Sequence, residues 1–130
     1  MATPLYEATD NGHLAAMQLL IDNGACVNTK KKDGCEMTPV HRASYRGDIN
    51  AIRLLIDNGA DINIVDTYKD TPLHDAANRG HLDIIRLLID HGANINAKNN
   101  GYSTPIGRAL IRRRDRAAQL LRECGAECLT

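Results

Sequence analysis

The amino-acid sequence predicts a mostly α-helical solenoid in which antiparallel helix pairs stack side by side. A Thr-Pro phrase recurs four times along the 130 residues, with spacings of 35, 33 and 33 residues. Glycine recurs at two fixed distances after each Thr, with one exception. Phe and Trp are absent, so the core must be built from Leu, Ile and Ala. A regular repeat of this length is the signature of a stacked architecture.

Each repeat begins with a short helix. Thr suits the N-cap and Pro suits the first helical position, where the missing N–H costs nothing. About two turns later a glycine stands at a position that we expect to be left-handed, except in the last unit, where Arg113 replaces it. The four phrases are Thr3-Pro4, Thr38-Pro39, Thr71-Pro72 and Thr104-Pro105.

A second helix follows in each repeat, for example over residues 82–91. Its apolar band is too wide for a single seam and suits a helix packed between two neighbours. One such helix pair cannot bury its apolar faces alone, whereas stacking makes the core continuous. We therefore expect Leu54, Leu55, Leu87 and Leu88 to be buried between units. The polar segment 94–103 contains an Asn-Asn-Gly turn signal, which indicates an extended loop or hairpin.

The residues of the repeat resemble those of ankyrin-repeat proteins. Residues 71–96 match that pattern almost throughout, from Thr71-Pro72-Leu73-His74 to Gly92-Ala93 and Asn96. The resemblance implies one domain over residues 1–130, with β-hairpin loops projecting from four repeats at about 3–37, 38–70, 71–103 and 104–130. Arg122 stands where the other units have isoleucine, so we interpret the last repeat as a C-terminal cap with a polar outer face.

Composition excludes several classes of protein. Lys plus Arg and Asp plus Glu are both 16, so the chain is not broadly basic. No apolar run approaches the roughly 20 residues that span a bilayer, and residues 1–6 do not resemble a secretory signal. We therefore expect an intracellular protein, cytoplasmic or nuclear, with no membrane partner. In that compartment Cys26, Cys35, Cys124 and Cys128 are expected to be thiols, with neither a metal nor a cofactor.

Nothing in the sequence indicates an enzyme. There is no nucleophile motif and no glycine-rich phosphate loop, because the glycines are separated by whole helices. His41 and His74 recur with the repeat. The resemblance implies that each of these histidines hydrogen-bonds within its own repeat and to the neighbouring loop.

The resemblance implies a non-catalytic protein-binding module, a scaffold or adaptor, whose concave surface is formed by loop tips and first helices. We expect a monomer that binds a protein partner. The column Arg42, Asp75, Arg108 alternates in charge and can pair internally, whereas Arg46, Arg79 and Arg112 are all positive and favour an acidic partner. The candidate partner-binding residues are Arg42, Tyr45, Arg46, Tyr68, Asp70, Asp75, Asn78, Arg79, Arg108, Ile111 and Arg112.

Two alternatives remain open. Six arginines within residues 104–130 favour a nucleic acid or another acidic surface, although aromatic residues for base stacking are missing. Nucleic acid is therefore the less favoured partner. The resemblance also implies that Asn28, Asn63 and Asn96 are candidate substrates of an asparaginyl hydroxylase, since each lies eight residues after a Leu.

Overall fold

The computed structural model describes residues 4–31 and 34–126, so Thr3 and Cys128 lie outside the described residues. Within the described residues the chain forms four helix pairs and no β-strand. The helices are α1 (Pro4–Asp10), α2 (Leu14–Asp22), α3 (Pro39–Arg46), α4 (Ile49–Asp57), α5 (Pro72–Arg79), α6 (Leu82–Asp90), α7 (Pro105–Ile111) and α8 (Asp115–Glu123). The predicted mostly α solenoid is confirmed.

Helices α3, α5 and α7 begin, and α3 and α5 end, as the repeat predicts. Thr38, Thr71 and Thr104 are the N-caps of α3, α5 and α7, each with proline at the first helical position. The glycines that end α3 and α5 are left-handed, with φ of 82° at Gly47 and 73° at Gly80. Arg113 adopts the same conformation with φ of 58°, because the chain must turn there whatever side chain it carries.

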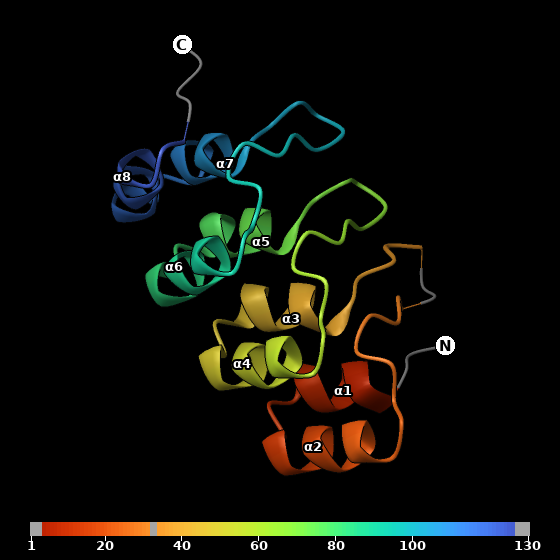
Figure 1. Cartoon of the computed structure of the whole chain (residues 1–130). Coiled ribbons are helices and arrows are strands. Elements are labelled where there is room, and N and C mark those ends of the chain that lie inside the picture. Colours follow the sequence, from red (N-terminus) through yellow and green to blue (C-terminus); the bar gives the residue numbers. More distant parts are fainter. Residues whose placement is uncertain (1–3, 32–33, 127–130) are drawn as a thin grey trace.

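The helix pairs stack in two rows (Figure 1). Helices α1, α3, α5 and α7 form one row, and α2, α4, α6 and α8 form the other. The loops project beside the first row, so that this row and the loop tips together form one continuous face. We call this surface the inner face, and the surface of the second row the outer face.

The core consists of equivalent positions from successive repeats. Leu5, Val40, Leu73 and Ile106 are the second residues of the four short helices, and each is at most 2% exposed. In the second row, Leu55, Leu88 and Leu121 occupy one repeat position and are fully buried. Leu54 and Leu87 are only half-buried, because each lies on the side of its helix that is nearer to solvent.

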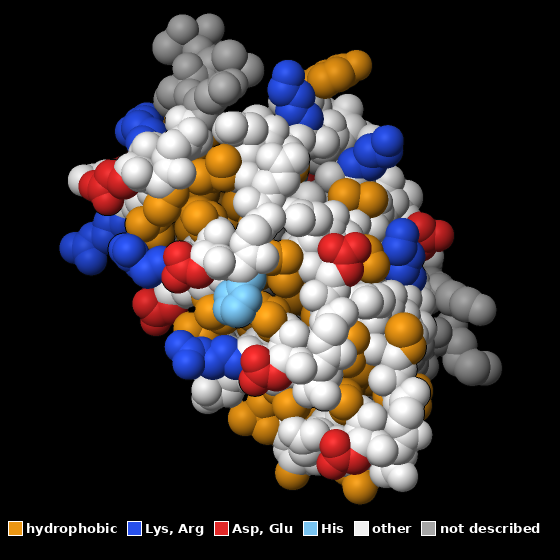
Figure 2. Space-filling model, viewed as in Figure 1, with side chains coloured by type: hydrophobic (Ala, Val, Ile, Leu, Met, Phe, Trp, Pro, Cys, Tyr) orange, Lys and Arg blue, Asp and Glu red, His pale blue; other side chains and the backbone are white. Residues whose placement is uncertain are grey.

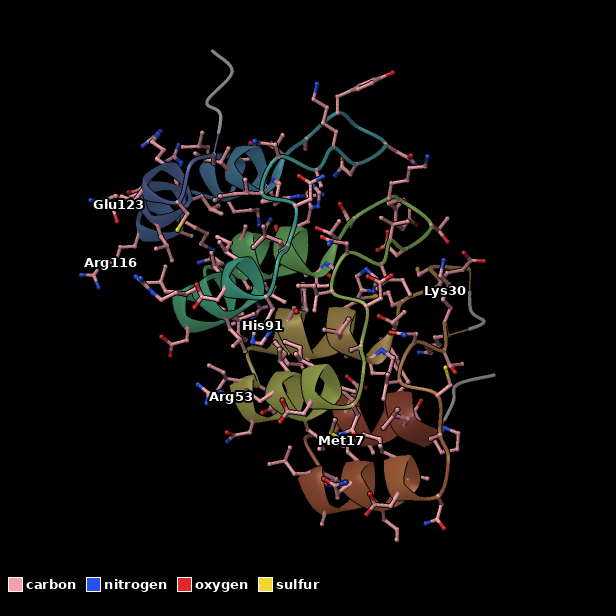
Figure 3. All side chains as sticks on the ribbon, in the orientation of Figure 1. Met17, Lys30, Arg53, His91, Arg116 and Glu123 are labelled. Carbon is pink, nitrogen blue, oxygen red and sulfur yellow. The ribbon has the colours of Figure 1, made fainter. Side chains whose placement is uncertain are left out.

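The two ends of the stack differ in polarity. The outer surface of α8 carries exposed charged residues such as Arg116, Arg122 and Glu123, two of which project from the helix in Figure 3. At the other end, Leu14 and Leu19 of α2 are 37% and 63% exposed. Apolar side chains reach the surface at this lower end in Figure 2. Among the described residues, the α8 end therefore has the more polar surface, which suits the end of a stack.

The loops follow the course of hairpins but contain no β-strand in the parts of the chain that the structure describes. The backbone N–H of Asp66 donates to Asp70 O at 3.1 Å, and that of Asn99 donates to Ser103 O at 3.0 Å. One such backbone hydrogen bond across each loop is too few to form a β-ladder. Bonds between neighbouring loops add to it, for example Asn100 N–H to Tyr68 O at 2.9 Å.

Candidate functional site

Two buried histidines, one in α3 and one in α5, each join their short helix to the next loop. His41 Nδ1 accepts from the backbone N–H of Thr38 at 3.1 Å, and its Nε2 lies 2.9 Å from Asp70 O. His74 makes the equivalent contacts with Thr71 N–H at 3.0 Å and with Ser103 O at 2.8 Å. An amide only donates and a carbonyl only accepts, so both rings are neutral with the proton on Nε2. The predicted contacts of both histidines are confirmed.

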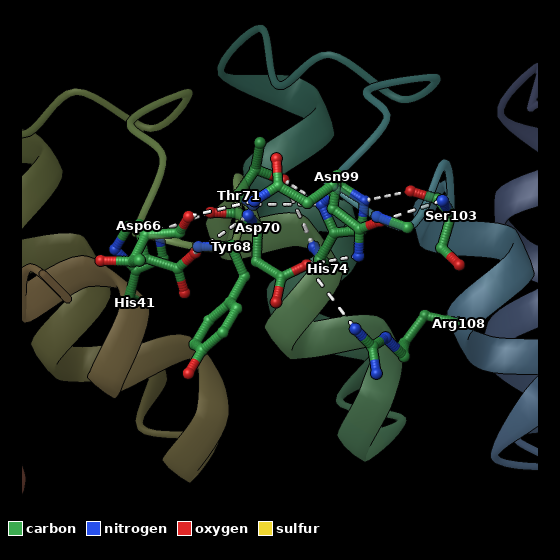
Figure 4. Close-up of polar contacts among 12 residues, drawn as sticks. His41, Asp66, Tyr68, Asp70, Thr71, His74, Asn99, Ser103 and Arg108 are labelled. Carbon is green, nitrogen blue, oxygen red and sulfur yellow. Dashed lines mark hydrogen bonds and ion pairs between the residues drawn. The ribbon is translucent and has the colours of Figure 1, made fainter. Parts of the chain in front are cut away.

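Asp66 and Asn99 shape the two loops above α5 and α7 (Figure 4). Asp66 Oδ1 accepts from the backbone N–H groups of Tyr68 and Asp70 at 2.9 and 3.0 Å. Asn99 Oδ1 accepts from the equivalent groups, at Gly101 and Ser103, while its Nδ2 donates to Asp70 Oδ1 at 2.7 Å. Each loop is thus fixed by its own buried side chain and then tied to its neighbour.

A cleft of about 310 Å³ opens on the inner face between these loops and the short helices. We call it the inner cleft. Side chains from all four repeats form its walls, so no single repeat could build it. Its lining residues are Cys35, Met37, Arg42, Tyr45, Asp66, Tyr68, Asp70, His74, Asp75, Asn78 and Arg108.

The two arginines of the inner cleft are paired with carboxylates other than Asp75. Arg42 forms an ion pair with Asp10, and Arg108 lies 3.6 Å from Asp70. The expected internal pairing of the Arg42, Asp75, Arg108 column is therefore wrong. Sequence spacing placed these three side chains in register, but Asp10 from α1 and Asp70 from the loop lie closer to the guanidinium groups.

One side-chain oxygen of Asp75 is buried without a hydrogen-bond donor among the described residues. Its Oδ2 is buried and accepts no hydrogen bond from any described residue, and the same holds for Oδ1 of Asn78, one turn further along α5. Burial, reinforced by the negative charges of Asp70 and Asp66, raises the pKa of the Asp75 carboxyl well above its usual value. Two residues with unsatisfied acceptors thus line the cleft.

Two tyrosine rings also line the inner cleft. The Tyr45 ring lies near two guanidinium groups, with Arg79 at 4.7 Å and Arg42 at 5.4 Å from the ring centroid. Tyr68 projects from the loop above and is 56% exposed. Cation–π contacts hold Tyr45 in place, whereas Tyr68 presents its ring to solvent and to any ligand in the cleft.

The structure divides the predicted partner-binding residues into two groups. Arg42, Tyr45, Tyr68, Asp70, Asp75, Asn78 and Arg108 line the inner cleft. The others lie outside its wall: Arg79 stacks on Tyr45, Arg46 donates to Asp10 O, and Ile111 and Arg112 are exposed beyond it.

Sequence reasoning missed Asp66 as a cleft residue and assigned His74 only a structural role. A signal for Asp66 was present, because Asn99 lies 33 residues later at the same place in its loop. A carboxylate or amide four residues before the last loop residue is typical of a side chain that caps its own turn. Cys35 gave no comparable signal.

The candidate modification sites Asn28 and Asn63 link neighbouring loops. Asn28 Oδ1 accepts from Asp61 N–H at 2.7 Å, and Asn63 Oδ1 accepts from Asn94 N–H at 2.8 Å. The backbone N–H of Asn96 donates to Asn94 Oδ1 at 3.2 Å, as that of Asn63 donates to Asp61 Oδ1 at 3.0 Å. The first two asparagines therefore have a structural role that explains their recurrence.

The C-terminal arginines spread over different parts of the last repeat. Arg108 points into the inner cleft, whereas Arg114 packs on Gly80 and donates to Asn78 O at 3.2 Å. Arg112, Arg113, Arg116 and Arg122 are exposed. Among the described residues, no group of three or more His, Cys, Asp or Glu side chains is arranged to hold a metal ion.

The buried histidines predict a pH dependence of stability. Burial lowers the pKa of His41 and His74 below about 6.5, the value expected in the unfolded chain. The unfolded state therefore binds more protons below that pH, and the free energy of unfolding falls as the pH drops from about 7.5 to 5.5. Urea unfolding should be measured in an Asp75→Asn background, because Asp75 titrates in the opposite sense.

A His74→Asn variant is the internal comparison for this pH effect. The Asn Oδ1 can still accept from Thr71 N–H but does not titrate, so the pH slope should fall by about half. The change in slope is the readout, since the variant also loses its bond to Ser103 O. An unchanged slope would show that these rings are not responsible for it.

Comparison with known families agrees with the architecture. A family model described as ankyrin repeats, in three copies, matches residues 1–66 and again residues 40–130. No curated protein matches the chain significantly. None of the described helices is long and apolar enough to cross a membrane. With four stacked helix pairs among the described residues and matches that together span its whole length, the chain belongs to the ankyrin-repeat family.

Proposed function

We propose that residues 1–130 act as one non-catalytic binding domain, an intracellular monomer that holds a protein partner on its inner face. Ankyrin repeats generally mediate protein–protein interactions. The observation that carries the proposal is the inner cleft itself, which brings Tyr45 and Tyr68 of one repeat together with Asp75 of the next. Tyr and Arg are the residue types that most often dominate binding energy at protein interfaces.

The exposed arginines beside the cleft suggest the chemistry of the partner's flanking residues. Arg79 stacks on Tyr45 and remains exposed, and Arg112 is exposed one repeat further along. Their guanidinium groups can donate to carboxylates in bidentate geometry. We therefore propose that the bound segment places acidic side chains over these two arginines.

Replacement of inner-face residues should weaken binding of the partner. We expect a Tyr45→Ala, Arg79→Ala double variant to bind at least about tenfold more weakly than the wild-type chain, because an aromatic anchor and its stacked cation are lost together. The partner captured by the wild-type chain would be identified by mass spectrometry and purified. Its affinity for each variant would then be measured by isothermal titration.

An outer-face double variant, Arg53→Ala with Arg86→Ala, is the matched control. Both arginines are exposed on α4 and α6, and Figure 3 shows Arg53 far from the loop residue Lys30. This variant should retain wild-type affinity. Binding that survives the inner-face change but is lost with the outer-face change would contradict the proposal.

A charge reversal at Arg79 isolates the acidic component of the partner. We expect Arg79→Glu to weaken binding while the melting temperature barely changes, because the residue is exposed. If the C-terminal arginines instead bind nucleic acid, affinity for a nucleic-acid probe would fall steeply with salt and would not depend on Arg79. If Asn28 or Asn63 is hydroxylated, the intact mass of the protein from its native source would show one added oxygen.

A further inference from the structure

The Asp75 carboxylate needs an explanation, because it is unsatisfied in a cleft that already contains two arginines. Oδ2 of Asp75 and Oδ1 of Asn78 are both buried acceptors without a donor among the described residues. Buried polar groups in folded proteins nearly always have a partner. The missing donor therefore indicates either a loss of folding free energy that the protein tolerates or a ligand that supplies the donor.

Charge in the cleft favours a ligand that is a cation. Three carboxylates line the inner cleft, at Asp66, Asp70 and Asp75. Arg108 offsets Asp70, but the other lining arginine, Arg42, is engaged by Asp10 outside the cleft wall. His74 is neutral. The cleft lining therefore has three carboxyl groups against two guanidinium groups, and one of these, that of Arg42, is shared with Asp10.

We infer that the inner cleft is the pocket for one basic side chain, a lysine or an arginine, of the protein partner. Its N–H groups would donate to the Asp75 carboxylate and to Asn78 Oδ1, while its aliphatic stem would lie against the Tyr68 ring. A cleft of about 310 Å³ has room for one long side chain. The inference rests on the proposed function and adds to it a basic anchor between the acidic contacts of the rim.

The geometry also separates the roles of the cleft residues. Asp70 is held by Asn99 and Arg108, and Asp66 caps its own loop, so both carboxylates are engaged by the protein itself. Asp75 is the carboxylate that lacks such an internal donor in the described structure. Replacing Asp75 should therefore remove cation binding without loosening the loops.

Small basic probes test the pocket without knowledge of the partner. The ¹⁵N-labelled chain would be titrated at millimolar concentration with Nα-acetyl-lysine methylamide, with Nα-acetyl-arginine methylamide and with the uncharged Nα-acetyl-norleucine methylamide. We expect at least one basic probe to shift the amide signals of Tyr45, Tyr68, Asp75 and Asn78, and the uncharged probe to leave them in place. Equal shifts with all three probes, or with none, would overturn the inference.

Two variants test whether the Asp75 carboxylate is the group that binds the basic probe. Asp75→Asn keeps the shape of the side chain and should weaken the basic probe at least about tenfold. Asp57→Asn removes an exposed carboxylate of α4 and should change nothing. Equal binding by the wild-type chain and Asp75→Asn would overturn the inference, as would shifts of the same residues by MgCl₂ alone.

The two proposals fail in different ways. Partner binding that depends on Tyr45 and Arg79, combined with no response to either basic probe, would remove the basic anchor and leave the protein-binding function intact. The opposite result is that a basic probe binds through Asp75 while the inner-face double variant binds the partner as well as the wild-type chain does. It would support the basic pocket and contradict the proposed function.

Discussion

A Leu88→Ala variant is expected to lose about 2–5 kcal/mol of unfolding free energy, the range for truncation of a buried leucine. Leu88 is fully buried in α6, and the equivalent residues Leu55 and Leu121 are equally buried in the helices on either side. A cavity at this position is bounded by a repeat above and a repeat below, so neither can collapse into it alone. Urea unfolding followed by circular dichroism measures the loss.

Leu19→Ala is the matched control, because it is the same substitution on the helix at the end of the described stack. Leu19 is 63% exposed, so the change should cost less than about 0.5 kcal/mol. Similar losses for both variants would show that Leu88 is not packed between repeats. A small domain has only about 5–15 kcal/mol in total, so the Leu88 effect should be unmistakable.

An Asp75→Asn variant is expected to be more stable than the wild-type chain by about 1–3 kcal/mol at pH 7, the cost of a buried unsatisfied polar group. The amide has nearly the same shape as the carboxyl and carries no charge to desolvate. It also brings a donor to the face of α5 on which Asn78 Oδ1 lacks one. The gain is measured by urea unfolding beside Asp57→Asn, which should match the wild type.

The pH dependence of this gain identifies its cause. The folded state holds the Asp75 proton to a higher pH than the unfolded chain, whose carboxyl titrates at about 3.9. The stability contributed by the protonated Asp75 carboxyl is therefore fully present below about pH 4. It is lost as the pH rises toward the pKa of Asp75 in the folded state. The advantage of Asp75→Asn should be largest at neutral pH and should shrink toward pH 4. A constant advantage would indicate better packing instead of removal of a buried charge.

A stabilising substitution inside the inner cleft would support the proposed basic anchor. Residues that bind ligands often cost stability in the free protein, because their polar groups are arranged for the ligand. Asp75 fits this description, whereas Leu88 does not. The same Asp75→Asn variant should therefore gain stability and lose the basic probe.

The repeat positions were predictable from the sequence alone, because they reflect local chemistry. Threonine before proline specified where α3, α5 and α7 begin, and Gly47 and Gly80 specified where α3 and α5 end. The contacts of His41 and His74 were expected from the family resemblance. Burial of Leu55 and Leu88 followed from apolar periodicity, which depends on neighbouring residues of one helix.

The inner cleft was only partly predictable. Tyr45, Tyr68 and Asp75 were found because equivalent repeat positions lie in register, but their partners were not. Asp10 engages Arg42 from the preceding repeat, and Asp70 engages Arg108 from a loop. These choices depend on distances between side chains from different repeats. Sequence spacing gives the register of a stack, whereas only the tertiary structure decides which of several nearby carboxylates reaches each arginine, and so which one is left unpaired.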